Sequence, residues 1–380
     1  MISNLPVYRS WFPHLNTGKL WLNHAAISPL NSRTKNAVEQ YLINRSEGSI
    51  DDFPQIVQIS QNTKLQLGKL INAPAERIGF VNNTSDGLNI LANGIDWKSG
   101  DRILLNDSEF PANVVPFLNL KRLGVEIDFV RTINDEIRLE DIEKAITPKT
   151  KILSISFVQF LSGFKSDLKA IGELCKRNNI IFCVDAIQGL GSTPIDVQES
   201  GIDFLSSGGH KWLLSMMGCG FIYITEELQA RLNQQCAGWT SNKHYFSNFF
   251  NYRLDFDETA RRYENGAQNN AGIVALGESV TLLNDVGISK IHLHLLSLTD
   301  YIFEYAELNG IETATPREHE KRAGIVTLKL PNAEKIFASL NEQNIIVSIR
   351  EGKIRISPHF YNSIEDIKMV CSTIKSFIKV

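Results

Sequence analysis

Short apolar runs alternate with helix-like segments through the middle of the chain, and this alternation constrains the fold most strongly. Ser166 begins one helix-like segment, as its expected N-cap, and the apolar positions between residues 170 and 175 fall on one helical face. Such alternation predicts a largely parallel sheet that is covered by helices on both faces. The runs with the length and composition of buried strands are residues 102–105, 125–130, 151–158, 180–184 and 220–224.

The texture of the sequence changes from about Val286. A long amphipathic stretch, residues 288–308, precedes three strand-like runs, and the last helix begins at Ser363 with Asp366 three residues on, which is typical of a capping box. We therefore predict a large domain of residues 16–285 and a smaller α+β domain of residues 1–15 and 286–380, with the first residues packed against the latter. The strand-like runs are residues 324–330, 345–349 and 353–357.

Composition excludes several classes of function. The 380 residues carry a net charge of −3, which gives no electrostatic reason to expect nucleic acid as a partner. The start of the chain lacks a basic segment followed by an apolar one, and no apolar run reaches the length of a membrane span. The five cysteines form no metal-binding spacing, and Cys175 and Cys183 lie in apolar surroundings. We expect a cytoplasmic protein with no metal site and no membrane partner.

The candidate chemistry rests on two residues. Asp185 ends one apolar run, and Lys211 follows in the small-residue segment Ser206-Ser207-Gly208-Gly209-His210-Lys211. Alone, such a lysine is typical of a solvated side chain and such an aspartate of a cap. Together they are what pyridoxal phosphate (PLP) requires, because a lysine amine forms a Schiff base with the cofactor aldehyde and a carboxylate keeps the pyridine nitrogen protonated. Asp185 also lies beyond the carboxyl end of its strand, where ligands bind in such sheets.

Further segments in the same order extend this pattern over nearly the whole chain. With them, the sequence resembles the class V aminotransferase group of PLP enzymes of fold type I, which includes cysteine desulfurases, kynureninases and isopenicillin N epimerase-like proteins. The resemblance implies an α/β fold, with a mainly parallel seven-stranded sheet in the large domain, and a homodimer with shared active sites. The segments are residues 21–26, 83–89, 185–188, 208–211, 262–266 and 354–362, of which 262–266 corresponds to the part lent to the neighbouring subunit.

The resemblance also implies roles for single residues around the ring of the cofactor. Lys211 would form the Schiff base and move the Cα proton, and Asp185 would pair with the pyridine nitrogen. Gln188 would bond the ring oxygen, unless it is a helix-surface residue. Phe110 would stack on the ring, unless it is buried in the core.

Other residues would bind the phosphate and the substrate. Thr84 and Ser85 at a helix start would bind phosphate, unless they only cap the helix, and His210 would join them. Arg355 would clamp the substrate carboxylate, unless it is a surface arginine or Arg350 takes that role. The residues expected to complete substrate binding are His24 and Ala26.

Two departures from the family bear on the reaction. Desulfurases carry a cysteine loop shortly before the arginine that matches Arg355, but residues 349–354 are short and contain no cysteine. Phe110 stands where desulfurases have a histidine that shuttles protons, so both features argue against desulfurase chemistry. Ala267 and Gly208 replace a threonine and a serine that bind phosphate in relatives, which predicts weaker phosphate binding unless Ser207 or Trp239 contributes.

The function that we expect is that of a PLP-dependent aminotransferase acting on an amino acid. An epimerase or racemase, or a kynureninase-like C–C or C–S lyase, needs the same core residues and remains an alternative. A PLP-binding protein without catalysis is disfavoured because Lys211, Asp185 and Arg355 are all present. A Rossmann-type nucleotide enzyme is disfavoured because no GxGxxG motif follows an early strand. The sequence leaves the substrate open, and it leaves open whether Trp239, Tyr245 and Phe246 line the pocket or pack in a core.

Overall fold

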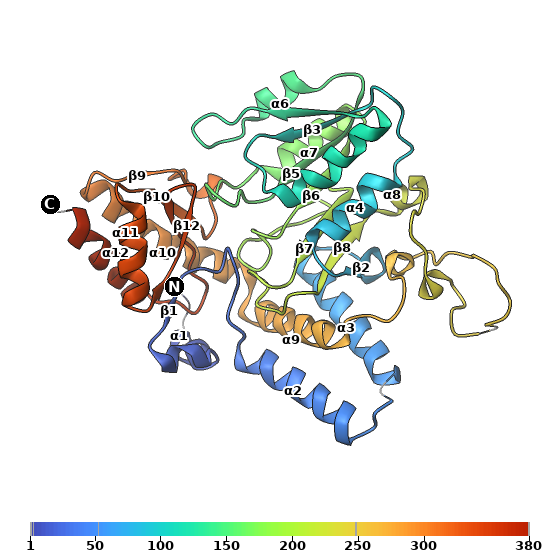
Figure 1. The fold of residues 1–380 in the computed structure, drawn as a ribbon, viewed down its shortest axis with the longest axis horizontal. Helices are drawn as coiled ribbons and strands as arrows, with labels where there is room; N and C mark the ends of the chain where they lie inside the picture. Colours follow the sequence, from blue (N-terminus) through green and yellow to red (C-terminus); the bar gives the residue numbers. More distant parts are fainter. Residues whose placement is uncertain (1, 3, 52, 248, 379–380) are drawn as a thin grey trace.

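The computed structural model describes residues 2, 4–51, 53–247 and 249–378, which form a large and a small layered unit (Figure 1). The strands are β1 Leu20–Trp21, β2 Ile78–Val81, β3 Arg102–Asn106, β4 Glu126–Val130, β5 Thr150–Ser156, β6 Ile181–Asp185, β7 Phe204–Gly208, β8 Gly220–Ile224, β9 Glu312–Thr313, β10 Val326–Lys329, β11 Ile345–Ile346, β12 Ser348–Arg350 and β13 Lys353–Ile356. The helices are α1 Leu5–Ser10, α2 Ser32–Glu47, α3 Phe53–Ile71, α4 Thr84–Gly94, α5 Val115–Leu118, α6 Leu139–Ala145, α7 Leu168–Arg177, α8 Glu226–Arg231, α9 Asn270–Val286, α10 Ile288–Leu308, α11 Ala333–Glu342 and α12 Ile364–Ile378.

The central sheet has seven strands in the order β2-β8-β7-β6-β5-β3-β4. All neighbouring pairs from β7 to β4 are parallel, whereas β8 runs antiparallel to both β7 and β2. The mainly parallel seven-stranded sheet that we expected is therefore confirmed. Its parallel strands end at one edge, which is where ligands bind in sheets of this kind.

Helices cover both faces of this sheet, because its central strands present buried side chains on both faces. Along β6, Phe182 and Val184 belong to one core cluster, and Ile181 and Cys183 belong to the other. The first cluster includes side chains of α3, α6, α7 and α9, and the second includes side chains of α4, α5 and α8. Helix α9 lies against α2 and α3, as Figure 1 shows along the lower edge of the large unit.

Some predicted elements are confirmed and others are corrected. Helix α10 spans the predicted residues 288–308, but α7 begins at Leu168 with Asp167 as its N-cap, since the Asp167 carboxylate accepts from the Ala170 amide. The hydroxyl of Ser166 donates to the Ser156 carbonyl instead, at 2.9 Å. Strand β7 lies where we expected a loop, because its small polar residues are buried on both sides. The predicted run 345–349 divides into β11, which pairs with β1, and β12, which pairs with β13.

The small unit holds an antiparallel sheet in the order β12-β13-β10-β9 together with α10, α11 and α12. The capping box of α12 is present, with Ser363 Oγ accepting from the Asp366 amide and Asp366 Oδ2 accepting from the Ser363 amide. The start of the chain packs here, because Arg9 pairs with Asp366 at 2.6 Å and Phe12 stacks on Tyr361. The domain boundaries stay a prediction.

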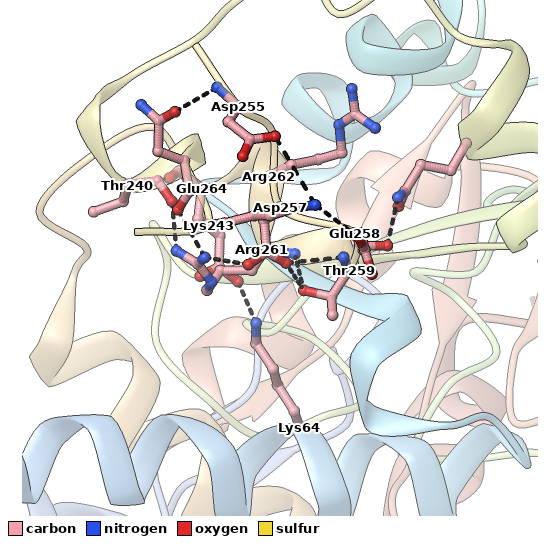
Figure 2. A network of polar contacts seen from close by, with 12 residues as sticks. Lys64, Thr240, Lys243, Asp255, Asp257, Glu258, Thr259, Arg261, Arg262 and Glu264 are labelled. Carbon is pink, nitrogen blue, oxygen red and sulfur yellow. Dashed lines mark hydrogen bonds and ion pairs between the residues drawn. The ribbon is translucent and has the colours of Figure 1, made fainter. Parts of the chain in front are cut away.

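Residues 238–247 and 249–264 belong to a projecting segment that has only short 3-10 turns and no α-helix, at the right of Figure 1. Figure 2 shows the polar network at its base, in which Arg261 pairs with Asp257 and Lys243 with Glu258. Glu264 ties the network to the core, since its carboxylate accepts from the Phe80 amide and pairs with Lys64 of α3.

Within the described residues, no single helix has both the length and the apolar composition of a membrane span. The pair α9–α10 meets these two criteria only when taken together, across a bend of 75°.

Candidate active site

A cavity of about 410 Å³ opens beyond the carboxyl ends of the parallel strands. We refer to it as the Lys211 cavity. Eight of the residues that we predicted to bind cofactor or substrate line this cavity. They come from separate segments of the sequence, which the fold brings together. These eight are Ala26, Thr84, Ser85, Phe110, Gln188, His210, Lys211 and Arg355. The other lining residues are Ala25, Asn83, Ala112, Phe160, Ile187 and Arg350.

Lys211 lies in a tight loop that follows β7. The loop is closed by bonds from the Gly209 amide to the Cys219 carbonyl and from the Ser215 amide to the Gly209 carbonyl, both 2.9 Å. Among the described residues, the ammonium group makes no hydrogen bond or ion pair, and it lies 5.5 Å from the centre of the Phe110 ring. Burial lowers the pKa of Lys211 to about 8, with Asp185 opposing the shift and Arg355 and Arg350 adding to it. The amine is therefore easier to deprotonate than a surface lysine.

Asp185 ends β6 and is almost completely buried, so it does not itself line the cavity. Burial raises the pKa of its carboxyl group to about 7, against a hydrogen bond from the Ile187 amide that lowers it. The charges of Glu109 and Lys211 act on the same pKa in opposite directions, upward and downward respectively. A buried carboxylate with one amide donor can pair with a cationic ring nitrogen.

Glu109 is a buried residue of this region that the sequence analysis missed. Its carboxylate accepts hydrogen bonds from the Ser156 amide, Asn113 Nδ2 and Gln159 Nε2, at 2.8, 3.0 and 2.9 Å. Gln159 therefore faces Glu109 and not the cavity. Because the Ser156 and Gln159 donors lie 47 and 50 residues further along the chain, only the proximity of Glu109 to the predicted Phe110 could have drawn attention to it.

Helix α4 directs its N-terminus at the cavity. Asn83 is its N-cap and accepts from the Asp86 amide, so Thr84 and Ser85 are the first helical residues and not its caps. The amides of such first residues have no partner within the helix and favour an anion. The Thr84 hydroxyl also accepts from the Gly208 amide, at 3.0 Å, which joins α4 to the end of β7.

Gln188 is not a helix-surface residue and Phe110 is not a buried core residue, which were the alternatives that the sequence left open. Gln188 is buried, with its amide nitrogen donating to the Ala25 carbonyl and its oxygen accepting from Trp212, both at 2.9 Å. One amide hydrogen of Gln188 is left for another acceptor. Phe110 is 42% exposed, with its ring edge toward Phe160, so it is not a core residue.

His210 and Arg355 contribute polar groups at different positions in the cavity. Burial, and then the charge of Lys211, lowers the pKa of His210 to about 4, so its ring is neutral at pH 7. Arg355 is 2% exposed and donates to Ser348 Oγ at 3.1 Å and to the Phe160 carbonyl at 2.6 Å. It is therefore not a surface arginine, and among the described residues it has no acidic partner.

Several expected residues lie elsewhere. His24, which we expected to contact substrate, is fully buried, with its ring nitrogens bonded to the Ser357 carbonyl and the Tyr361 hydroxyl. Ser207 and Trp239 do not line the Lys211 cavity either. Residues 263–269, including Ala267, line a separate groove of about 510 Å³ beside α4.

The aromatic side chains of Trp239, Tyr245 and Phe246 on the projecting segment neither line the Lys211 cavity nor pack in a core, the two arrangements that the sequence left open. Trp239 and Phe246 are 49% and 56% exposed, and neither lines the Lys211 cavity. Their rings contact one another, with Tyr245 and Phe249 joining on this segment and Phe53 on α3. We call these five residues the aromatic cluster.

The residues of the Lys211 cavity fit PLP by the chemistry of their groups. Unpaired helix amides suit a phosphate, an exposed aromatic ring suits a flat heterocycle, and an amine without an ion pair suits an aldehyde. The volume is also of the size that small-molecule sites have.

Comparison with known proteins agrees with this chemistry. The chain is 27% identical over 361 residues to "Uncharacterized aminotransferase YcbU" of Bacillus subtilis, covering 95% of each chain. It is 26% identical to a "Probable cysteine desulfurase" of Methanothermobacter thermautotrophicus, covering 89% of this chain and 88% of that one.

Solved structures share the fold. The apo structure of a cysteine desulfurase from Thermococcus onnurineus NA1 matches with a TM-score of 0.90 at 23% identity, over 98% of both chains. The cystine C–S lyase C-DES matches with a TM-score of 0.87 at 22% identity, over 96% of this chain and 98% of that one. The family described as aminotransferase class V matches residues 20–370. The chain therefore belongs to the class V aminotransferase family, and its cofactor is pyridoxal phosphate.

Proposed function

We propose that this protein is an aminotransferase, which moves the amino group of an α-amino acid to its cofactor. The observation that carries the proposal is that Lys211 is the one described side chain of the cavity that can take up and release a proton near neutral pH. Burial, and then the charge of Lys211, lowers the pKa of His210 to about 4, and guanidinium groups do not act as bases near neutral pH. A proton that leaves one carbon and returns to another needs only one such base.

Each residue has a distinct part in this proposal. When bound, PLP supplies an aldehyde for the amine and a ring that draws electrons from the substrate Cα. Lys211 Nζ removes the Cα proton and returns it, and Asp185 holds the proton on the ring nitrogen. Arg355 orients the α-carboxylate by paired hydrogen bonds.

The remaining predicted residues hold the cofactor. The α4 amides with Ser85 bind the phosphate, next to His210. Phe110 would stack on the ring, and the free amide hydrogen of Gln188 would bond the ring oxygen.

Two of the alternatives need groups that the described lining residues do not supply. Racemisation by two bases needs a second proton carrier, and His210, the other titratable ring at the cavity, has a pKa that burial lowers to about 4. Desulfurase chemistry needs a cysteine nucleophile, and no cysteine lines the cavity.

A C–S lyase is the second candidate, because it requires the same lysine and because relatives named as desulfurases and a C–S lyase resemble this chain. Release of a keto acid and ammonia from cystine or cysteine, without formation of the aminated cofactor, would identify this reaction.

The test compares Lys211→Ala with Lys165→Ala, which changes a half-buried lysine outside the cavity whose pKa burial also lowers. We expect the wild type and Lys165→Ala to show the absorption of lysine-bound PLP, and an amino acid to convert it to the aminated cofactor. Lys211→Ala should lose the lysine-bound absorption and at least ~10²-fold of the conversion rate, the scale of one general acid–base group. Equal spectra and rates in the two variants would contradict the proposal.

A further inference from the structure

The Lys211 cavity has an excess of positive charge on its substrate side. Three cationic side chains line it, Lys211, Arg350 and Arg355, and no aspartate or glutamate is among its described lining residues. Lys211 is assigned to the cofactor and Arg355 to the α-carboxylate. Arg350 is then a cation at the same cavity with no assigned role.

The hairpin that joins β12 and β13 places this second arginine. Its turn has only two residues, Glu351 and Gly352, both with positive φ, of 47° and 68°. The register pairs Arg350 with Lys353 and Ser348 with Arg355. Residues that face each other across antiparallel strands share one face, so Arg350 and Arg355 lie on the same side of the hairpin.

Arg350 is free to bind an anion. Its guanidinium donates to the carbonyl of Ile349 at 2.8 Å, and it forms no ion pair among the described residues. Burial is the main cause of the lowered pKa of Lys211 and of Arg355, and the charge of Arg350 lowers both further, as like charges do when they share a site. One substrate carboxylate can pair with only one of the two guanidinium groups in a bidentate fashion.

We propose that the substrates are α-amino acids with a second acidic group, with Arg350 binding the distal carboxylate while Arg355 binds the α-carboxylate. This inference rests on the proposed amino acid chemistry and narrows its substrate class to dicarboxylic amino acids. Arg350 stands at the exposed end of the hairpin and Arg355 at its buried part, so the distal group of the substrate points outward.

The experiment measures binding of unreactive acids to the PLP-loaded enzyme by calorimetry. Glutarate and pentanoate have the same chain length and differ by one carboxylate. We expect the wild type to bind glutarate on the order of 10-fold more tightly, the scale of one charge-assisted hydrogen-bonded pair.

Arg350→Gln should reduce that ratio to near one and leave pentanoate binding unchanged. Lys353→Gln is the matched control, because it removes a positive charge from the same face of the same hairpin at a position that does not line the cavity. It should keep the ratio.

Three results would overturn the inference. The ratio could already be near one in the wild type, it could survive in Arg350→Gln, or pentanoate binding could weaken in Arg350→Gln as much as glutarate binding, which would make Arg350 the α-carboxylate site. Conversion of the cofactor by alanine reports separately on the proposed function, so failure of the two proposals can be told apart. Glutamate or aspartate should convert it faster than alanine, and Arg350→Gln should remove that preference.

Discussion

Asp185 is a residue whose charge state depends on its burial. Its carboxyl group titrates near pH 7 in the folded chain, because burial and the neighbouring Glu109 disfavour the charged form. In an unfolded chain it titrates at its ordinary value near 4. Between these two pH values the Asp185 carboxyl group binds about one proton more in the folded than in the unfolded protein, so its contribution to stability falls as pH rises.

We predict that Asp185→Asn flattens this dependence in cofactor-free protein. From pH 5 to pH 7 the variant should gain on the order of 2 kcal/mol in unfolding free energy relative to wild type, since one proton is worth about 1.4 kcal/mol per pH unit. Urea denaturation at the two pH values measures the difference. If the unfolding free energies of the two proteins changed equally between pH 5 and pH 7, Asp185 would already be ionised at pH 5.

Residues within local motifs were the ones that the sequence could predict. Lys211, Asp185 and Arg355 stand in short segments with a recognisable order, and the structure brings Lys211 and Arg355 to one cavity, with Asp185 close enough to shift the pKa of Lys211. Glu109 and His24 depend on partners far away in the chain, Ser156 and Tyr361 among them, and no spacing rule describes such contacts.

At the scale of elements, the site depends on how closely α4 approaches the end of β7. A Cβ atom at Gly87 would lie 2.2 Å from Ser206 Oγ and 2.6 Å from Ile222 Cγ2. Neither atom can retreat far, because both residues are fully buried in neighbouring strands. Glycine at this position thus lets the helix start lie beside the lysine loop.

We predict that Gly87→Ala weakens cofactor retention by at least ~10-fold, because moving the helix start away loses on the order of one charge-assisted bond to phosphate. Gly94→Ala, in the same helix, adds the same methyl group where the nearest atoms are 3.4 Å away, and should retain the cofactor. Dialysis followed by absorption measurement compares them. Equal losses from both variants would show that the α4–β7 approach does not matter.

The elements were predicted where hydrophobic periodicity is strong. The apolar strands β5, β6 and β8 and the long helix α10 were recognised, whereas β7 was not. Its residues Ser206 to Gly208 have the composition of a loop, and they form a strand because α4 and the neighbouring strands enclose them. That enclosure is a tertiary effect that no local propensity contains.

At the scale of the whole molecule, the aromatic cluster gathers exposed aromatic side chains on one projecting segment. Phe250 and Tyr252 beside it are each 88% exposed. Exposed apolar groups of this extent are typical of an interaction site. The family resemblance assigns the adjoining residues 262–266 to a neighbouring subunit, so we propose that the cluster packs against a second copy of this chain.

We predict a dimer in light scattering. Replacing Phe250 and Tyr252 by serine should raise its dissociation constant by at least ~10-fold, since tyrosine is enriched among the few interface residues whose removal costs about 2 kcal/mol or more. The exposed Leu308→Ser, at the far end of α10, is a matched loss of apolar surface and should not change the mass. A fully active monomeric wild type would refute the proposed assembly.

The two-residue turn at Glu351 and Gly352 has a consequence for engineering. A side chain at Gly352 would meet no atom within 4 Å, and the turn lies next to an arginine at the mouth of the cavity. The turn therefore has open space around Gly352, beside a residue that lines the cavity. The hairpin is therefore a graft point at which a longer, cysteine-bearing loop could bring a sulfur nucleophile to a cavity whose described lining residues include none. Such a graft would supply one of the two groups that separate this chain from desulfurases, and Phe110→His would supply the other.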